Sequence, residues 1–414
     1  MSKRNEKRLG YKKTKIGWIP EEWKCVKFDN IVRFAQGQVL PTEEPYINYY
    51  YIGPENIDSG TGEIKDLKLV KELNLISGKY LFDERAIIYS KIRPNLNKVC
   101  FPKFTGVCSA DVYPLWVKSG VEAEYFYHFI RSVYFLKQAV SCSMRTGLPK
   151  VNREELKSFM VFLPPLPEQK KIAEILSAWD RAIELTNRLI EAKKKLKKGL
   201  MQQLLTGRRR FPEFGPSKEA NPGALPVGWS LKKASEIFKN KSIKKHNNAP
   251  VLSVTQDQGV VRRDSLDRKI NMSIENTDNY KLVEPGDFVI SLRSFQGGLE
   301  YSELKGLVSP AYHVISPIKE IDDDFYKHYF KSYGFIGHLA SAVIGIRDGK
   351  QISFNDFSFM KIPYPPLKEQ RRIGEALDTC DKEIFLLEKK GAAFKKQKQG
   401  LMQKLLTGEV RVRL

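Results

Sequence analysis

The sequence predicts an α+β protein built from two similar halves, each a mixed α/β domain followed by one long helix. One stretch occurs twice, as LPPLPEQKKIAEIL from residue 163 and as YPPLKEQRRIGEAL from residue 364. Short β-like runs bounded by turn residues precede each copy. At 414 residues, the chain is also too long for one compact core, which favours two domains or more.

The duplication extends well beyond the quoted letters. From Pro164 and Pro365 the copies run without a gap at one offset (365 − 164 = 201) until GLMQQLLTG (199–207) matches GLMQKLLTG (400–408). Weaker matches lie outside, such as GWIPEEW (17–23) with GALPVGW (223–229). A repeat of this length indicates two tandem halves. The predicted segments are a first domain (1–162), a first long helix (163–207), a linker (208–228), a second domain (229–362), and a second long helix with a C-terminal tail (363–414).

In each domain a predicted strand leads directly into polar and basic residues. The first strand covers 86–89, and the second covers 288–292 after a turn at 284–287. Arginine contacts guanine edges, asparagine and glutamine contact adenine, and glycine lets the backbone approach a phosphate. A solvated loop has the same composition, so that reading stays open. The candidate DNA-binding residues of these loops are Lys91, Arg93, Asn95, Asn97 and Lys98 in the first domain, and Arg293, Ser294 and Gln296 in the second.

Near the end of each domain a second basic turn occurs. Arg145 begins an RTG turn, and Arg347 begins RDGK, which ends at Lys350. Such turns can hold a phosphate, and they can equally be plain surface turns. Arg145, Arg347 and Lys350 complete the set of candidate DNA-binding residues.

Each repeated segment has the features of one long helix. Pro167 suits a first-turn position, Glu168 and Glu369 place negative charge where the helix dipole favours it, and Gly207 and Gly408 suit helix termination. Apolar residues recur at alternating steps of four and three, which predicts a coiled-coil seam. The alternative is two separate amphipathic helices, each covering its own domain. The predicted seam residues are Ile172, Leu176, Trp179, Ile183 and Ile190 in the first copy, and Ile373, Leu377, Ile384, Leu387 and Phe394 in the second.

Three seam positions are unusual for a coiled coil. Gly391 weakens a helix interior by roughly 1 kcal/mol relative to alanine. Lys193 and Lys197 occupy seam positions in the first copy, where their ammonium groups have to extend out of the seam.

The charge of the chain indicates a polyanionic partner. It has 70 Lys and Arg against 48 Asp and Glu, a formal net charge of +22, which favours nucleic acid over a membrane surface. The N-terminus lacks the apolar core of a signal peptide, and no apolar run reaches the roughly 18 residues that a membrane span needs. We therefore expect a cytoplasmic protein. The five cysteines form no CxxC pair, so neither a zinc site nor a disulfide framework is indicated.

Motifs for catalysis are missing from the sequence. GIRDGKQ (345–351) is one residue short of a phosphate-binding P-loop and ends in Gln. The double prolines are followed by leucine and lack the residues with which DNA amino-methyltransferases hold a flipped base. The five histidines form no HExxH, so no metal site and no catalytic residue are assigned. The chain is predicted to be non-catalytic and to carry no cofactor.

Together these features resemble the specificity subunit of a type I restriction-modification system. The resemblance covers the whole chain and depends most on LPPLPEQKKIAEIL, GLMQQLLTG and their repeats, with YYIGPENIDSGTGEI (49–63) as a further match. It implies two target-recognition domains separated by two long antiparallel coiled-coil helices in a pseudo-two-fold arrangement, reading a bipartite asymmetric site on double-stranded DNA. It also implies two methyltransferase subunits and motor-endonuclease subunits as partners, which would carry S-adenosylmethionine, ATP and Mg.

Two functions from other classes remain as alternatives. A stand-alone DNA methyltransferase or nuclease with degenerate motifs would modify or cut DNA as the purified chain. A basic coiled-coil scaffold would bind DNA without regard to sequence.

Overall fold

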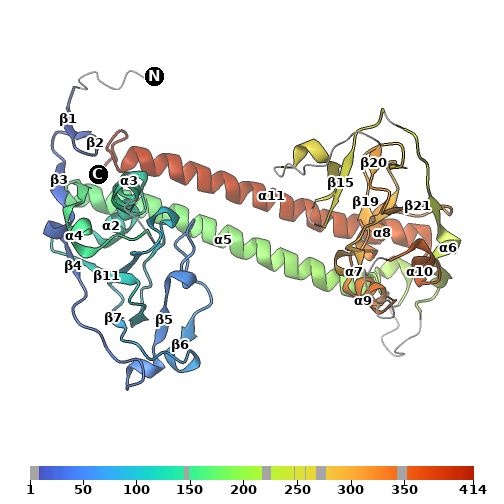
Figure 1. Ribbon diagram of the computed structural model, residues 1–414, viewed down its shortest axis with the longest axis horizontal. Coiled ribbons are helices and arrows are strands. Elements are labelled where there is room, and N and C mark those ends of the chain that lie inside the picture. Colours follow the sequence, from blue (N-terminus) through green and yellow to red (C-terminus); the bar gives the residue numbers. More distant parts are fainter. Residues whose placement is uncertain are drawn as a thin grey trace. The chain divides into compact units, whose positions relative to one another are not determined.

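The computed structural model describes residues 9–143, 149–216, 225–246, 248–256, 258–266, 277–342 and 352–414. The chain divides into two compact units, one formed by Met1–Asn187 with Lys389–Leu414 and the other by Arg188–Glu388. Each unit holds one mixed domain, the beginning of the long helix that follows this domain, and the end of the other long helix (Figure 1).

The first domain is organised around an antiparallel sheet with the strand order β4-β11-β8-β9. Ile87 and Tyr89 of β8 face a cluster that contains Phe126, while Ile88 faces a second cluster that contains Phe82. Both faces of β8 are therefore covered, which explains its unbroken apolar sequence. The strands are β4 (Val32–Phe34), β11 (Val112–Val117), β8 (Ile87–Ser90) and β9 (Val99–Cys100).

A second sheet of the first domain has the order β6-β5-β10-β7, in which β5 and β10 are parallel. Two antiparallel pairs, the hairpin β1-β2 and the long-range pair β12-β3, complete the domain. The strands are β6 (Lys68–Leu69), β5 (Tyr50–Ile52), β10 (Gly106–Cys108), β7 (Tyr80–Phe82), β1 (Tyr11–Thr14), β2 (Gly17–Pro20), β3 (Lys24–Lys27) and β12 (Met160–Leu163). The helices are α1 (Phe28–Ile31), α2 (Ala123–Ile130), α3 (Val133–Ser143) and α4 (Arg153–Ser158).

The second domain repeats the central sheet in the order β14-β21-β18-β19. Its strands are β14 (Phe238–Lys241), β21 (His313–Pro317), β18 (Phe288–Ile290), β19 (Glu300–Tyr301), β13 (Ser230–Lys233), β22 (Lys361–Tyr364), β15 (Leu252–Thr255), β16 (Gly259–Arg262), β17 (Lys281–Val283) and β20 (Gly306–Val308). Its helices are α6 (Ala234–Ile237), α7 (Ser294–Gly297), α8 (Asp323–Tyr329), α9 (Tyr333–Ala342) and α10 (Phe354–Ser358). β13 pairs with β22 as β3 pairs with β12, and β15 pairs with β16.

The predicted strand over 288–292 is too long. β18 ends at Ile290, because the Ser291 N–H donates to Ser294 Oγ at 2.8 Å and the chain turns into α7. The first predicted strand, 86–89, is β8 shifted by one residue.

The two long helices are α5 (Leu166–Leu204) and α11 (Leu367–Leu405), each of 39 residues. Both end before a glycine at φ +69°, Gly207 and Gly408. A Cβ at Gly207 would lie 2.2 Å from Pro226 Cγ, and one at Gly408 would lie 2.4 Å from Pro20 Cγ. Both glycines are therefore required by conformation and by space. No helix among the residues described is both long and apolar enough to cross a bilayer.

Within each unit the two long helices run antiparallel. In the first unit Ile172 and Leu176 lie in one cluster with Leu405 and Leu406, and further along α5 the Trp179 ring lies 5.6 Å from the ring of Phe394, nearer the start of α11. In the second unit Lys193 Nζ lies 2.6 Å from Glu383 Oε2 and Lys197 Nζ lies 2.5 Å from Asp381 Oδ2. Residue numbers rise along α5 as they fall along α11.

The predicted seam residues occupy the less exposed faces of the two helices. Ile172, Leu176, Ile183, Ile190, Ile373, Leu377 and Ile384 are buried, and Trp179, Leu387 and Phe394 are half-buried. Ile172 and Leu176 pack with Leu405 and Leu406 in the core of the first domain, so each domain core includes parts of both helices. Burying one leucine side chain contributes roughly 1.5 to 3 kcal/mol. Lys193 and Lys197 reach carboxylates of α11 rather than bulk solvent.

The repeated EQ dipeptide fastens each domain to both helices. Glu168, 2% exposed, accepts hydrogen bonds from Trp23 Nε1 at 2.9 Å and from Arg411 Nε at 2.7 Å. Gln169 accepts the Glu122 N–H at 2.8 Å and donates to the Pro164 carbonyl at 2.8 Å. The motif therefore joins the domain, the beginning of α5 and the tail that follows α11.

The second unit has the same junction. Glu369, 1% exposed, accepts hydrogen bonds from Trp229 Nε1 at 2.9 Å and from Arg210 Nε and Nη2 at 2.8 and 2.7 Å. Gln370 accepts the Asp322 N–H at 2.9 Å and donates to the Pro365 carbonyl at 2.8 Å. Arg210 and Arg411 each lie three residues after the glycine that ends a long helix, so the stretch occurs twice because two such junctions have to be closed.

Candidate nucleic-acid interface

The first candidate surface is the loop that follows β8. Arg93 has a left-handed backbone (φ +47°) and an exposed side chain. Its N–H donates to the Pro149 carbonyl at 2.7 Å, and the Val151 N–H donates to the Lys91 carbonyl at 2.8 Å. The loop 91–98 is thus held beside the segment 149–151, which directly follows the second predicted basic turn. Arg145, in that turn, lies outside the described residues, as do Arg347 and Lys350.

The other candidates of this loop differ in what their side chains do. Asn95 is exposed. The Asn97 side-chain amide donates to the Arg131 carbonyl at 2.8 Å, and Lys98 Nζ donates to the Pro54 carbonyl at 2.6 Å. Lys91 Nζ lies 3.8 Å from Asp111 Oδ1 and 5.6 Å from the centre of the Tyr113 ring. Asn97 and Lys98 therefore shape the loop, whereas Arg93 and Asn95 project from it.

The corresponding loop of the second domain follows β18. Arg293 and Gln296 are exposed, and the Arg293 carbonyl accepts Gln256 Nε2 at 3.1 Å. Ser294 is 1% exposed and holds the turn through the Ser291 N–H, so its hydroxyl faces the protein. A Cβ at Gly298 (φ +76°) would lie 1.9 Å from the Phe330 carbonyl oxygen. Packing therefore requires a glycine at this position.

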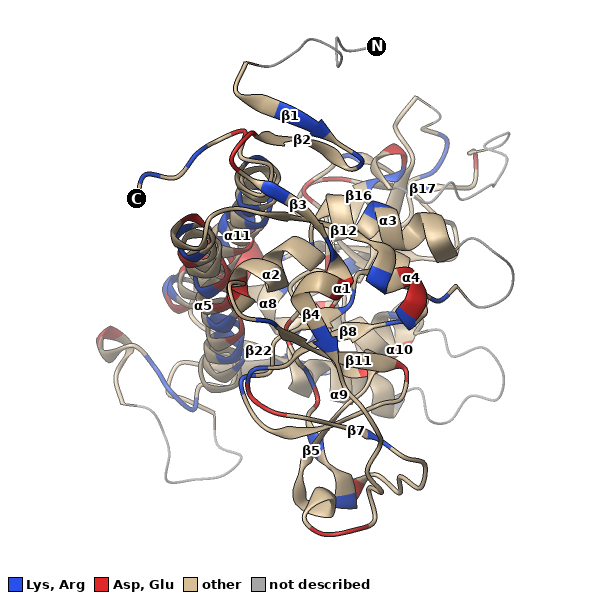
Figure 2. Ribbon diagram, turned by 90° about the vertical axis from the view of Figure 1, so that its left-hand side faces the viewer, with Lys and Arg blue, Asp and Glu red and all other residues tan. Residues whose placement is uncertain are grey.

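Basic residues are not confined to these loops. Figure 2 shows Lys and Arg on separate elements of the first domain, β1 and α4 among them. Positive charge on several elements can bind the phosphates of a polyanion over a broad surface, whereas base edges are contacted by a few positioned side chains.

One group of side chains has the composition of a metal site. Ligand atoms of His328, Asp378 and Asp381 lie within 4.8 Å of one another. Lys197 Nζ, however, lies 2.5 Å from Asp381 and Lys382 Nζ lies 3.1 Å from Asp378. The positive charge that these carboxylates attract is therefore supplied by lysine, and we assign no metal here.

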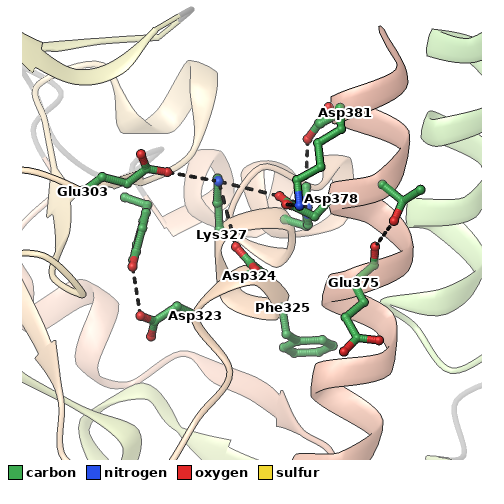
Figure 3. Close-up of polar contacts among 12 residues, drawn as sticks. Glu303, Asp323, Asp324, Phe325, Lys327, Glu375, Asp378 and Asp381 are labelled. Carbon is green, nitrogen blue, oxygen red and sulfur yellow. Dashed lines mark hydrogen bonds and ion pairs between the residues drawn. The ribbon is translucent and has the colours of Figure 1, made fainter. Parts of the chain in front are cut away.

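A further lysine completes this ion-pair network. Lys327 Nζ lies among Glu303, Asp324 and Asp378, at 3.6, 3.9 and 3.8 Å from their carboxylate oxygens (Figure 3). Burial, followed by the charge of Lys197, lowers the pKa of His328 to about 4, so its ring is neutral near pH 7. The first unit has a similar group, in which His128 lies beside the Asp180–Lys398 pair.

The residues that close the two junctions were not predicted from the sequence. Trp23, Trp229, Arg210 and Arg411 were not singled out, although the two GxxPxxW phrases and the arginines after each LLTG were visible in the repeat. The lysine–aspartate pairs between the helices were harder to predict, because the sequence showed only that a lysine occupied a seam position.

Comparisons with known proteins agree on one family. A profile described as type I restriction modification DNA specificity domain matches residues 20–194 and 226–393. The chain is 27% identical over 424 residues to the type I restriction enzyme MjaVIII specificity subunit of Methanocaldococcus jannaschii, covering 95% of this chain and 94% of the relative. It is 36% identical over 169 residues to the type I restriction enzyme EcoDI specificity subunit of Escherichia coli, covering 40% of this chain and 37% of the relative.

A solved structure extends the likeness to the fold. The S subunit of a type I restriction-modification system from M. genitalium matches with a TM-score of 0.58 at 15% identity, covering 98% of this chain and 99% of that chain.

Proposed function

The chain belongs to the family of type I restriction-modification DNA specificity proteins, and on that premise we propose that it is the sequence-specificity subunit of such a complex. Each domain would read one half of a bipartite, asymmetric target on double-stranded DNA. The observation that carries this is the repetition of one sheet order in two domains, each with an exposed arginine after the same central strand, Arg93 after β8 and Arg293 after β18.

The two reading loops differ in residue and shape, so their half-sites should differ. After Arg93 the chain forms a 3-10 turn over Pro94–Leu96 with Asn95 exposed, whereas after Arg293 it forms the short α-helix α7 with Gln296 exposed. Arginine in a major groove favours guanine, and an amide favours adenine. From the sequence-predicted set, Arg93, Asn95, Arg293 and Gln296 are the proposed base-reading residues, with Lys91, Arg145, Arg347 and Lys350 as proposed phosphate contacts.

The catalytic steps would belong to partner subunits. We propose that two methyltransferase subunits bind the long helices and that motor-endonuclease subunits join the full complex, in the cytoplasm. In the second unit, Leu189, Leu196, Phe385 and Leu386 of α5 and α11 are 45%, 50%, 63% and 62% exposed, which supports a protein partner on these helices. S-adenosylmethionine, ATP and Mg would be bound by the partners, and this chain would need no cofactor.

Methylation mapping tests the proposal. Cells that carry this chain with its methyltransferase partners are expected to methylate one motif made of two short half-sites and a fixed gap. Exchanging residues 1–162 for the domain of a relative should change one half-site and leave the other unaltered. Methylation at one continuous motif, or a change in both half-sites, would contradict the assignment of one half-site to each domain.

A further inference from the structure

The first domain carries a cleft of about 730 Å³ whose charge none of the motifs above explains. Its lining residues come from α1, β4, the turn before β8, the end of β11 and the segment after it, α2 and α4. Asp29 is the single carboxylate among these residues. We call this cleft the basic cleft, after its cationic lining residues Arg33, Arg85, Lys118, Arg153 and Lys157.

Aromatic rings hold two arginines of the basic cleft. Arg33 Cζ lies 5.3 Å from the centre of the Trp116 ring, and Trp116 Nε1 donates to Asp83 Oδ1 at 2.7 Å. Arg153, which is half-buried, lies over three further rings, 5.6, 5.5 and 5.3 Å from the centres of Phe34, Tyr80 and Tyr113. A ring face orients a guanidinium without neutralising its charge.

Within the described part of the chain, two of the five cations of the basic cleft are paired with carboxylates, and three are not. Arg85 pairs with Asp83 and Lys157 pairs with Glu154, each at 2.7 Å. Among the residues that the structure describes, no ion pair involves Arg33, Lys118 or Arg153. Oriented guanidinium groups without a carboxylate partner are suited to an anion with several oxygen acceptors, as in a phosphate group.

The second domain lacks this arrangement at the matching positions. Arg33 faces Trp116 across the β4-β11 pair, whereas Lys239 faces Ser316 across β14-β21. The first residue of α4 is Arg153, and the first residue of α10 is Phe354. The shared fold therefore does not require the basic cleft, and its residues are a property of the first domain.

The basic cleft lies beside the loop that carries Arg93. Arg153 follows Val151 by two residues, and the Val151 N–H is bonded to the Lys91 carbonyl at 2.8 Å. Arg153 of the basic cleft and Lys91 of the loop lie over the same ring, 5.3 and 5.6 Å from the centre of Tyr113. The major groove of DNA is about 12 Å wide, so a duplex read at Arg93 has backbone phosphates within reach of the basic cleft.

We propose that the basic cleft binds the phosphodiester backbone of duplex DNA beside the half-site read by the first domain. The inference rests on the proposed function. It adds an asymmetry to that function, because Ser316 and Phe354 stand in the second domain at the positions of Trp116 and Arg153.

The test is DNA binding by the complex of the chain with its methyltransferase subunits, titrated on target and scrambled duplexes at several salt concentrations. Arg33→Gln with Arg153→Gln should weaken binding about a hundredfold on both duplexes, since each charge-assisted hydrogen bond contributes about tenfold or more. The salt slope should shrink by about two, and by about one for either single variant. Lys137→Gln, which removes an exposed charge on α3, is the control and should leave the affinity and the salt slope unchanged.

Three results would overturn the proposal. The first is a loss of affinity no greater than that of Lys137→Gln. The second is a loss confined to the target duplex, which would mean that these arginines read bases, and the third is competition by inorganic phosphate at constant ionic strength, which would mean that the cleft binds a small anion. A second double variant, Arg33→Gln with Arg153→Lys, keeps a positive charge over the rings. Its salt slope should equal that of Arg33→Gln alone. The test therefore does not depend on whether the Arg153→Gln protein folds. Wild-type complex that fails to prefer its target would count against the proposed function and not against the basic cleft.

Discussion

At the scale of single residues, whether a polar side chain can contact DNA depends more on its hydrogen-bond partners in the fold than on its residue type. Ser294 and Gln296 are two positions apart in one loop, yet Ser294 is buried with its hydroxyl bonded to the backbone and Gln296 is exposed. Asn97 and Asn95 differ in the same way in the first domain. The residues able to read bases are those that the backbone turns outward.

Arg293 is the clearest residue for testing base reading. If its guanidinium forks onto a guanine, Arg293→Ala should cost roughly 1 to 3 kcal/mol on the target duplex and far less on a scrambled one. Binding titrations of the complex with methyltransferase subunits, on both duplexes and at several salt concentrations, measure the difference. Equal losses on both, with a salt slope smaller by about one, would make Arg293 a phosphate contact instead.

His328 should make stability depend on pH. Its pKa is lowered to about 4 by burial first and by Lys197 second, while an unfolded chain has the ordinary value near 6.5. Between these values the unfolded chain binds a proton that the folded chain does not. Stability should therefore be intact above pH 6.5 and fall as the pH drops towards 4, by up to roughly 3 kcal/mol.

Urea unfolding at pH 7, 5.5 and 4.5 measures this dependence. His328→Gln should flatten the curve relative to wild type over that range, and the difference between the two proteins removes the titration of carboxylates from the comparison. Parallel curves would show that His328 is not held neutral in the folded state.

At the scale of elements, the long helices combine a buried apolar face with charged positions that are paired across the helices. Lys197 and Lys398 each reach an aspartate of the partner helix, Asp381 and Asp180. Lys398 is 8% exposed, and burial lowers its pKa. Removing one member of a buried pair leaves an uncompensated charge, so these positions disfavour other alignments of the two helices.

Glycines of α11 provide a direct test of helix packing. A Cβ at Gly391 would lie 3.5 Å from Thr186 Cγ2, an ordinary contact, so Gly391→Ala should stabilise the protein by up to about 1 kcal/mol. A Cβ at Gly374 would lie 2.5 Å from Asp322 Oδ1 and 3.0 Å from Asp324 Cβ, so Gly374→Ala should destabilise it. Thermal unfolding of the two variants should shift in opposite directions, and a shift in the same direction would contradict the packing of α8 on α11.

At the scale of the whole molecule, both units use one type of junction but close it differently. In the second unit, Arg210 belongs to the segment between α5 and the second domain, so a continuous chain leads from the helix end to Trp229. In the first unit, Arg411 and Gly408 near the C-terminus meet Glu168 and Tyr11, and the closure is non-covalent. The last residues of the chain are thus part of the first unit.

The sequence by itself determined the division into two halves, the two long helices and the character of their buried face. These follow from local periodicity and from the repeat, which depend on residues close together in the chain. Glu168 and Glu369 were recognised for their place in the first helical turn. Their bonds to Trp23 and Arg411, and to Trp229 and Arg210, connect residues more than 130 positions apart and were not visible in a window of sequence.

Only the tertiary structure decided which polar residues face solvent and which charges gather. Arg33, Arg85, Lys118 and Arg153 come from separate segments, and no local pattern unites them. Their meeting depends on the strand order β4-β11-β8, which is set by burial of both sheet faces. The physical reason is that a repeat or a helical period involves residues close together in the sequence, whereas a site consists of residues from distant segments that packing brings together.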